Sequence, residues 1–154
     1  MEQDSSDKKE FIIVCMIGGA ESGQRFTMWP HHITLLPWFE AVDVHEVIKA
    51  VGSGIEKFGS VDTETTERAY LGLRKQPVIL VENTDKLQTL HNKLLGTIQQ
   101  NGWPIKGRWV GDLFKPHITQ KMGKDYQGKV KIDEIYIVES QAQGYRQIVG
   151  RIEL

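Results

Sequence analysis

Apolar residues recur at helical spacing in two segments of the chain. The first segment opens at Asp43, and its stripe consists of Val44, Val47, Ile48, Val51, Ile55 and Phe58. The second opens at Asn83-Thr84 and ends at Asn101-Gly102, and its stripe consists of Leu87, Leu90, Leu94, Leu95 and Ile98. A recurrence every three or four residues places side chains on one face, so the pattern predicts two amphipathic helices.

The ends of the first helix have recognisable signals, but its interior has two weak points. Asp43 and Glu46 together resemble a capping box, and Gly59 is expected to end the helix. Gly52 and Gly54 lie inside the helix, where each glycine costs about 1 kcal/mol. We therefore expect packing, rather than helix propensity, to hold this segment.

The remaining apolar segments are short or alternate with polar residues, which is typical of strands. Residues 11–17 form a continuous apolar run that ends at Gly18-Gly19, and we expect further strands at 63–73, 77–82 and 108–114. The charged segment 123–129 is predicted to be a turn. Two strands with period 2 close the chain. In the first, Ile135 and Ile137 alternate with Tyr136 and Val138; in the second, one face is predicted to hold Ile148, Gly150, Ile152 and Leu154.

The tripeptide His-Ile-Thr occurs twice, at 32–34 and 117–119, and a proline precedes each copy within two residues. On a strand, residues i and i+2 point the same way. His32 would therefore share a face with Thr34, and His117 with Thr119. The isoleucine between them would point into apolar packing. Each copy has its own helix and strands nearby, which indicates two similar lobes.

If two such strands lay side by side, two imidazoles and two hydroxyls would converge on one cleft. Histidine titrates near neutral pH, so one ring can act as a general base while the other acts as a general acid. The hydroxyls can donate hydrogen bonds to phosphate oxygens on which charge must be stabilised. This constellation favours displacement at phosphorus without a metal.

The two motifs resemble those of the 2H phosphoesterase superfamily, which includes the 2′-5′ RNA ligase-like (LigT-like) proteins. The segments "PHHITLLPWF" and "KPHITQK" look like its first and second motifs, and "IDEIYIVESQAQGYRQIVGRIEL" looks like its closing strand pair. The resemblance implies a bilobal α+β fold: two antiparallel-sheet lobes, each with a helix, related by a pseudo-two-fold around a central cleft. It would make residues 11–154 a single two-lobed domain after a disordered leader at 1–10.

The resemblance also implies a function and a set of site residues. It implies hydrolysis of a 2′,3′-cyclic phosphate or a 2′-5′ phosphodiester at RNA ends or in small nucleotides, with no cofactor or metal. The acid/base and phosphate-binding residues would be His32, Thr34, His117 and Thr119. Candidate substrate-binding residues around them are Arg25, Lys115, Lys121 and Tyr145. Many family members carry an arginine where this chain has Met122, and Lys121 keeps the charge without a bidentate fork.

Other interpretations of the same residues are open. The histidines could be ordinary strand residues, the cleft could bind RNA ends without turnover, or the enzyme could join RNA by a 2′-5′ linkage. A zinc site at His31, His32 and His117 is disfavoured because adjacent strand residues point to opposite faces. His45 falls on the polar face of the first helix and His91 borders the stripe of the second, so both are interpreted as structural or exposed.

Composition and charge further limit the functions that are compatible with the sequence. The net charge of −1 and the pI of about 6.5 disfavour binding of long duplex nucleic acid, but not of a single phosphate. Cys15 is the one cysteine, which excludes an intramolecular disulfide and predicts a buried thiol. With no long apolar run and no signal-peptide pattern, we expect a cytoplasmic protein that does not contact membranes. We also expect a monomer.

Overall fold

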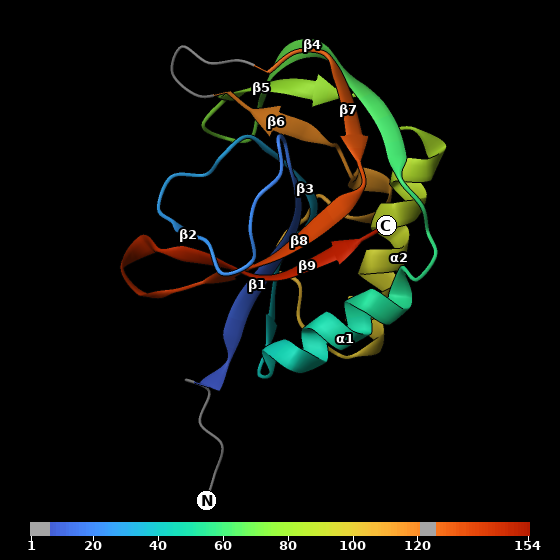
Figure 1. Cartoon of the computed structure of the whole chain (residues 1–154). Coiled ribbons are helices and arrows are strands. Elements are labelled where there is room, and N and C mark those ends of the chain that lie inside the picture. The colour runs from blue at the N-terminus through green and yellow to red at the C-terminus, as the bar shows by residue number, and fades with distance from the viewer. Residues whose placement is uncertain (1–6, 121–125) are drawn as a thin grey trace, which may run out of the picture.

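The computed structural model describes residues 7–120 and 126–154. Two α-helices and nine strands occupy these residues (Figure 1), with two short 3-10 helices, η2 (Gly111–Leu113) and η3 (Ala142–Gly144). The helices are α1 (Val44–Gly54) and α2 (Asp85–Gln100). The strands are β1 (Lys9–Met16), β2 (Arg25–Phe26), β3 (His32–Ala41), β4 (Val61–Leu71), β5 (Gln76–Val81), β6 (His117–Thr119), β7 (Lys129–Ile132), β8 (Glu134–Ser140) and β9 (Arg146–Glu153).

The strands follow the order β2-β9-β8-β1-β3-β6-β5-β4-β7, and every pairing along this order is antiparallel. The order falls into two halves. The first half consists of β2, β9, β8, β1 and β3, and so contains strands from both ends of the chain. The second half consists of β6, β5, β4 and β7. The halves meet where Ile33 of β3 pairs with Ile118 of β6. The predicted α+β class is confirmed.

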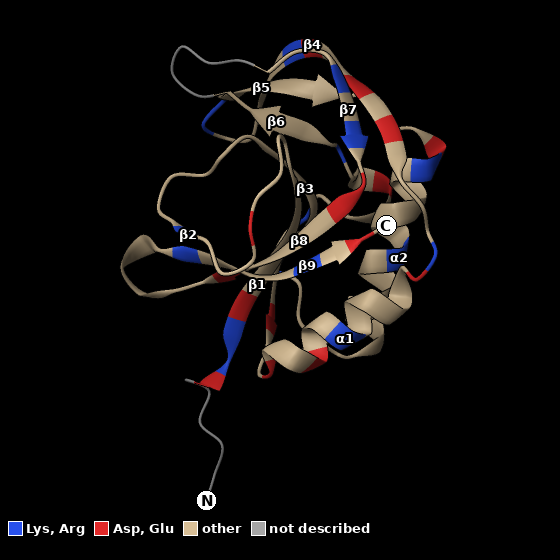
Figure 2. Ribbon diagram, viewed as in Figure 1, with Lys and Arg blue, Asp and Glu red and all other residues tan. Residues whose placement is uncertain are grey.

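Two apolar clusters lie on opposite faces of the strands. The larger cluster includes Ile33 and Ile118 and the buried stripes of both helices, which cover one face of the sheet (Figure 1). The smaller cluster lies on the other face and consists of Ile12, Val14, Met16, Phe26, Tyr136, Val138 and Ile148. In Figure 2 the ribbons of β5 and β6 carry no Lys, Arg, Asp or Glu, as expected for central strands.

The helix signals in the sequence are largely confirmed. The side chain of Asp43 caps α1 by accepting from the backbone N–H of His45, and Thr84 caps α2 by accepting from Leu87. However, α1 ends at Gly54, before Gly59. A Cβ at Gly54 would collide with the hydroxyl of Thr97 in α2. The glycine therefore lets the two helices approach, and this contact explains a residue that weakens the isolated helix.

Two strand predictions were wrong. Residues 108–114 do not form a strand, because Gly111 adopts a positive φ of 61° and begins η2. In the last strand, Ile148 and Ile152 do not share a face. Val138 pairs with Ile148 and Ile137 pairs with Gly150, so one extra residue is inserted between these pairs. This bulge reverses the alternation, and Ile148 joins the smaller cluster whereas Ile152 packs on the larger one.

The predicted boundaries of two further segments differ from the structure. Strand β1 begins at Lys9, inside the predicted leader, because Lys9 and Glu10 pair with Ala41 and Glu40 of β3. The predicted turn at 123–129 overlaps β7, which begins at Lys129, and its first three residues lie outside the described part of the chain. Within the described residues, neither helix is long and apolar enough to cross a membrane.

Candidate active site

The two His-Ile-Thr tripeptides lie side by side at the start of β3 and in β6. Because Ile33 and Ile118 are antiparallel partners, His32 lies across from Thr119 and His117 lies across from Thr34. Both isoleucines are almost completely buried, at 0% and 1% exposure, under the helices. By alternation the two histidines and two threonines share the opposite face. In a regular antiparallel pair, diagonal neighbours such as His32 and His117 lie about 7–8 Å apart.

Both motif histidines make the same local contact. The Nδ1 atom of His32 lies 2.9 Å from the carbonyl oxygen of Pro30, and Nδ1 of His117 lies 2.8 Å from that of Lys115. A carbonyl can only accept, so Nδ1 is the donor in each ring. In a neutral ring this places the lone pair on Nε2. The contact to residue i−2 therefore gives both rings the same tautomer, with Nε2 as the atom that can take up a proton.

An aromatic cluster supports His32. The indole of Trp29 stacks on the imidazole with 4.3 Å between ring centroids, and Phe26 and Trp38 pack edge-on against Trp29. The guanidinium of Arg146, from β9, lies 5.6 Å from the centroid of Trp29. Trp29 thus fixes the orientation of the His32 ring and connects it to β9.

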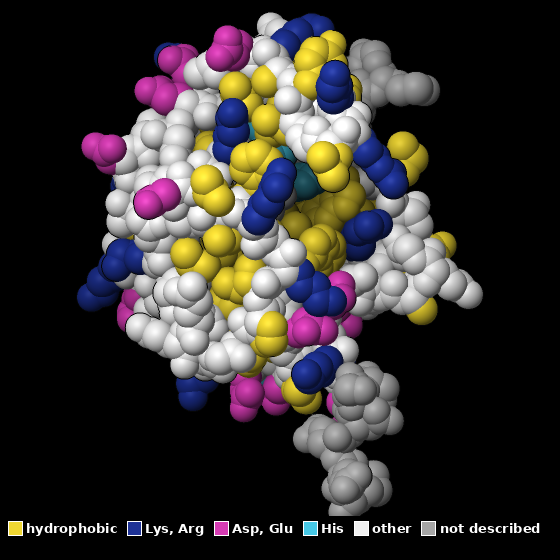
Figure 3. Space-filling model, turned by 180° about the vertical axis from the view of Figure 1, so that it is seen from behind, with side chains coloured by type: hydrophobic (Ala, Val, Ile, Leu, Met, Phe, Trp, Pro, Cys, Tyr) yellow, Lys and Arg dark blue, Asp and Glu magenta, His cyan; other side chains and the backbone are white. Residues whose placement is uncertain are grey.

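A cavity of about 220 Å³ lies beside His117. Its polar lining comes from Thr34, Lys115 and His117, and its apolar lining from Ile12, Pro37, Trp109 and Phe114. Figure 3 shows histidine side chains in a hollow with hydrophobic side chains on its floor, Lys and Arg around it, and Asp and Glu mostly away from it. The hollow therefore offers a positively charged rim to an anion.

The environment of His117 favours its neutral form. Burial of the ring lowers the pKa of His117 below its usual value, and the nearby charge of Lys115 lowers it further, although the bond to the Lys115 carbonyl opposes this. A lowered pKa keeps the ring neutral near pH 7. A neutral imidazole in contact with a cavity is suited to accept a proton.

The structure brings some of the predicted substrate-binding residues to the site. Lys115 lines the cavity next to His117. Arg25 and Tyr145 lie together on the β2–β9 side, where the guanidinium is 4.6 Å from the ring centroid, but neither lines this cavity. Lys121 lies outside the described residues. Of the three that the structure describes, Lys115 is the one that lines the cavity beside the motifs.

Three aromatic residues and one histidine near the motifs were not singled out as site residues by the sequence analysis. They are Trp29, Trp109, Phe114 and His91, which is fully buried. One signal was present in the sequence: Trp29 and Phe114 each stand three residues before a motif histidine. No comparable spacing marks Trp109 or His91, whose positions depend on how the chain folds. As expected, His45 is exposed and His91 is structural.

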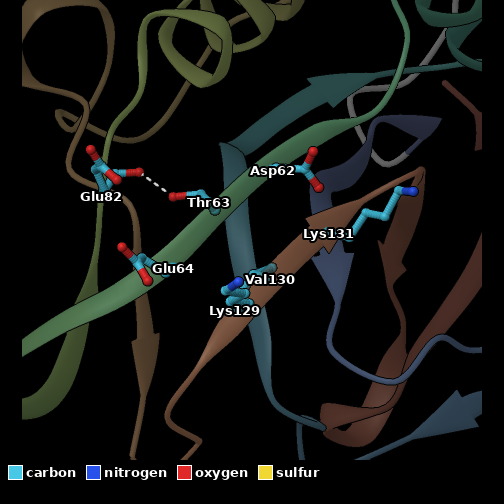
Figure 4. Close-up of a pocket in the computed structure, with 7 residues that line it drawn as sticks. All are labelled: Asp62, Thr63, Glu64, Glu82, Lys129, Val130 and Lys131. Carbon is cyan, nitrogen blue, oxygen red and sulfur yellow. Dashed lines mark hydrogen bonds between the residues drawn. The ribbon is translucent and has the colours of Figure 1, made fainter.

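A larger hollow, of about 620 Å³, lies away from the motifs along β4 and β7 (Figure 4). Asp62 and Glu64 of β4 are paired in register with Lys131 and Lys129 of β7. The hydroxyl of Thr63 donates to the carbonyl of Glu82. Because opposite charges face each other across the strands and the one buried hydroxyl has an internal partner, this hollow is a solvated sheet surface and not a second candidate site.

Comparisons with known proteins show where this fold occurs. No protein-family model matches the sequence, and no curated protein matches it. Among solved structures, E. coli LigT complexed with 3′-AMP is similar with a TM-score of 0.65 and 15% identity, over 96% of this chain and 98% of LigT. A structure described as a phosphoesterase has a TM-score of 0.61 and 18% identity, over 95% and 98%.

A third similar structure is TT0787 of Thermus thermophilus, with a TM-score of 0.62 and 12% identity over 94% of this chain and 97% of that one. All three likenesses extend over nearly the whole of both chains, so they concern the complete arrangement of strands and helices. At these identities they show the fold. The chain therefore has the α+β fold of LigT, which is consistent with the resemblance of its two motifs to the 2H phosphoesterase superfamily.

Proposed function

We propose that this chain is a metal-independent phosphoesterase. It hydrolyses a 2′,3′-cyclic phosphate or a 2′-5′ phosphodiester, at an RNA end or in a small nucleotide, by paired-histidine acid/base catalysis. The observation that carries this proposal is the pairing of Ile33 with Ile118, which sets two histidines and two threonines on one face of the sheet. The likeness to LigT, a protein solved in complex with 3′-AMP, supports nucleotides as the substrate class.

In the proposed reaction His117 is the general base. Its Nε2 takes a proton from a water molecule while the water oxygen forms a bond to phosphorus. The bond between phosphorus and one ribose oxygen breaks, and the product is a phosphate monoester. The lowered pKa of His117 supports this role, because a base must be neutral before the reaction.

His32 is the general acid that gives a proton to the departing ribose oxygen. Stacking on Trp29 supports this assignment, since a protonated imidazole is attracted to the face of an indole. After one turnover His32 has lost a proton and His117 has gained one, and exchange with solvent restores both. One water molecule is consumed for each bond broken.

The hydroxyls of Thr34 and Thr119 donate hydrogen bonds to the non-bridging phosphate oxygens. Each threonine lies across from the histidine of the other motif, so each histidine has a hydroxyl facing it on the neighbouring strand. Lys115, which lines the cavity beside His117, adds positive charge. Donors fixed before the reaction stabilise charge at little reorganisation cost.

The direct test is incubation of the purified chain with the four nucleoside 2′,3′-cyclic phosphates and a short 2′-5′ oligonucleotide, followed by chromatography of the products. We expect phosphate monoesters from the cyclic substrates, at rates that EDTA does not change. A double variant, His32→Ala with His117→Ala, is the control for contaminating activity. Saturable binding without any product would instead identify a non-catalytic nucleotide-binding module.

A further inference from the structure

His91 of α2 is a fully buried histidine outside both motifs, and both of its ring nitrogens are engaged. Its Nδ1 lies 2.7 Å from the carbonyl oxygen of Leu35 in β3, one residue beyond Thr34. The backbone N–H of Gly111, at the start of η2, donates to its Nε2 over 2.9 Å. One side chain thus joins the strand that carries the first motif to the segment that leads into the second.

These contacts require a neutral ring. Because the Gly111 N–H is a donor, Nε2 must hold the lone pair, and Nδ1–H then donates to Leu35. A charged ring would have hydrogens on both nitrogens and could not accept from Gly111. Burial lowers the pKa of His91, although the bond to Leu35 opposes this, in agreement with the neutral form.

The ring of His91 also stacks on Phe114, with 4.0 Å between centroids and 5° between the ring planes. Phe114 stands three residues before His117, as Trp29 stands three residues before His32. Trp29 stacks on the histidine of its own motif. The aromatic residue of the second motif stacks on His91 of α2 instead.

The cavity beside His117 has one wall formed by Phe114, with Trp109, Pro37 and Ile12 as its other apolar lining. Its volume is about 220 Å³, and an apolar cavity of about 150 Å³ is already large enough to bind benzene. That is room for a planar heteroaromatic ring or a similar flat group, and apolar and aromatic walls suit its faces.

We propose that His91 is a positioning residue that holds Phe114 in the wall of this cavity and so keeps the cavity open for the flat base of a nucleotide substrate. The inference rests on the proposed function, because it concerns the part of the substrate that does not react. His91 contacts the carbonyl of Leu35, the N–H of Gly111 and the ring of Phe114. It acts through Phe114, and the cavity places the base on the His117 side of the site.

Two substrates that differ only in the base distinguish a role in base binding from a role in supporting the whole site. The first is adenosine 2′,3′-cyclic phosphate, and the second is methyl β-ribofuranoside 2,3-cyclic phosphate, which has the same reacting group but no base. The variant His91→Asn keeps a donor for Leu35 and loses the ring that stacks on Phe114. The variant Phe114→Leu keeps an apolar side chain but removes the other ring of the His91–Phe114 stack. His45→Asn, at an exposed histidine of α1, is the matched control.

For both variants we expect KM for the adenosine substrate to rise about tenfold with kcat little changed, since stacking of one base contributes about this much. For the substrate without a base, kcat/KM should stay within about twofold of the unaltered chain. His45→Asn should change neither. If one variant fails to fold, as judged by its thermal melting curve, the other still decides the question.

Equal losses on both substrates would overturn the inference, because His91 would then support the site as a whole. Unchanged kinetics on both would overturn it as well, because Phe114 would not need His91. In either case the proposed function would stand. If the unaltered chain turned over neither substrate, the proposed function would be lost and this inference with it.

Discussion

Ile33 and Ile118 lie opposite each other on β3 and β6, and each is the middle residue of a His-Ile-Thr tripeptide. Their side chains are almost fully buried beneath the helices, and the pair joins the two halves of the strand order. The same contact therefore stabilises the core and sets the register in which the polar residues of the two motifs face each other.

The isoleucine pair should be costly to truncate. We expect Ile33→Ala or Ile118→Ala to lower the free energy of unfolding by about 2–5 kcal/mol, because each leaves a cavity in a packed core. The double variant should lose less than the two single losses added together, since the residues are in contact. Urea unfolding of all four chains measures this. Ile152→Ala, at a half-buried position in β9, is the control and should cost less. Strictly additive losses would contradict the direct contact.

Replacement of either motif histidine should stop catalysis without unfolding the chain. For His32→Asn and His117→Asn we expect turnover of a 2′,3′-cyclic phosphate to fall by about 10²–10⁴-fold, because each variant removes one proton-transfer group. Melting temperatures should change little, since both rings lie at half-buried positions outside the core clusters. Chromatographic assays and thermal melting curves give the two measurements. Substantial activity in both variants would exclude the paired-histidine mechanism.

The acid limb of the pH–rate profile should report on His117. The general base must be neutral, so activity falls as pH drops through the pKa of this group in the free enzyme. Burial holds that pKa below 6.5, and we expect the acid midpoint of kcat/KM to lie below pH 6.5 as well. Initial rates at constant ionic strength across the pH range measure it. An acid midpoint above pH 6.5 would argue against His117 as the base.

Stability should fall in mild acid because His91 is buried in its neutral form. Its pKa is lowered in the folded chain, whereas in the unfolded chain it returns to about 6.5. Below that pH, His91 binds a proton in the unfolded chain but not in the folded chain. The free energy of unfolding should then drop, by up to about 1.4 kcal/mol per pH unit for one such group, until the lowered pKa is reached.

Urea unfolding at about pH 7.5 and about pH 5.5 tests this dependence on both sides of the unfolded-state pKa. His91→Asn should be less stable at the higher pH and should lose less on acidification than the unaltered chain. His117 has a lowered pKa too and contributes in the same direction, so some dependence remains in the variant. An unchanged slope in His91→Asn would show that His91 does not titrate as its burial requires.

Gly107 allows the segment before Trp109 to approach β3. A Cβ at Gly107 would lie 2.6 Å from Cβ and 2.7 Å from Cγ of Pro37, which lines the cavity. We expect Gly107→Ala to cost about 1–3 kcal/mol of stability because the segment must shift. KM for a cyclic nucleotide should rise as well. Gly52→Ala is the matched control, since a Cβ there meets nothing within 4 Å and alanine favours the helix by about 1 kcal/mol.

The helices and most strands of this fold follow from interactions between near neighbours in the chain. Helical spacing and caps placed both helices, apolar runs and alternation placed most strands, and the period of two predicted that each motif histidine shares a face with its threonine. These signals need only near neighbours in the chain. These signals failed at two places. The positive φ of Gly111 gives η2 in place of an expected strand, and the extra residue of the bulge in β9 moves Ile148 to the other face of the sheet.

Which surfaces meet depends on the assembled fold. No local pattern fixes that Ile33 pairs with Ile118, that Phe114 stacks on His91, or that Gly107 packs against Pro37. Such contacts join residues far apart in the chain and depend on strand register and on the packing of α2 across the sheet. The motif residues can thus be recognised from short stretches of sequence, whereas the shape of the cavity beside them depends on the packing of the whole fold.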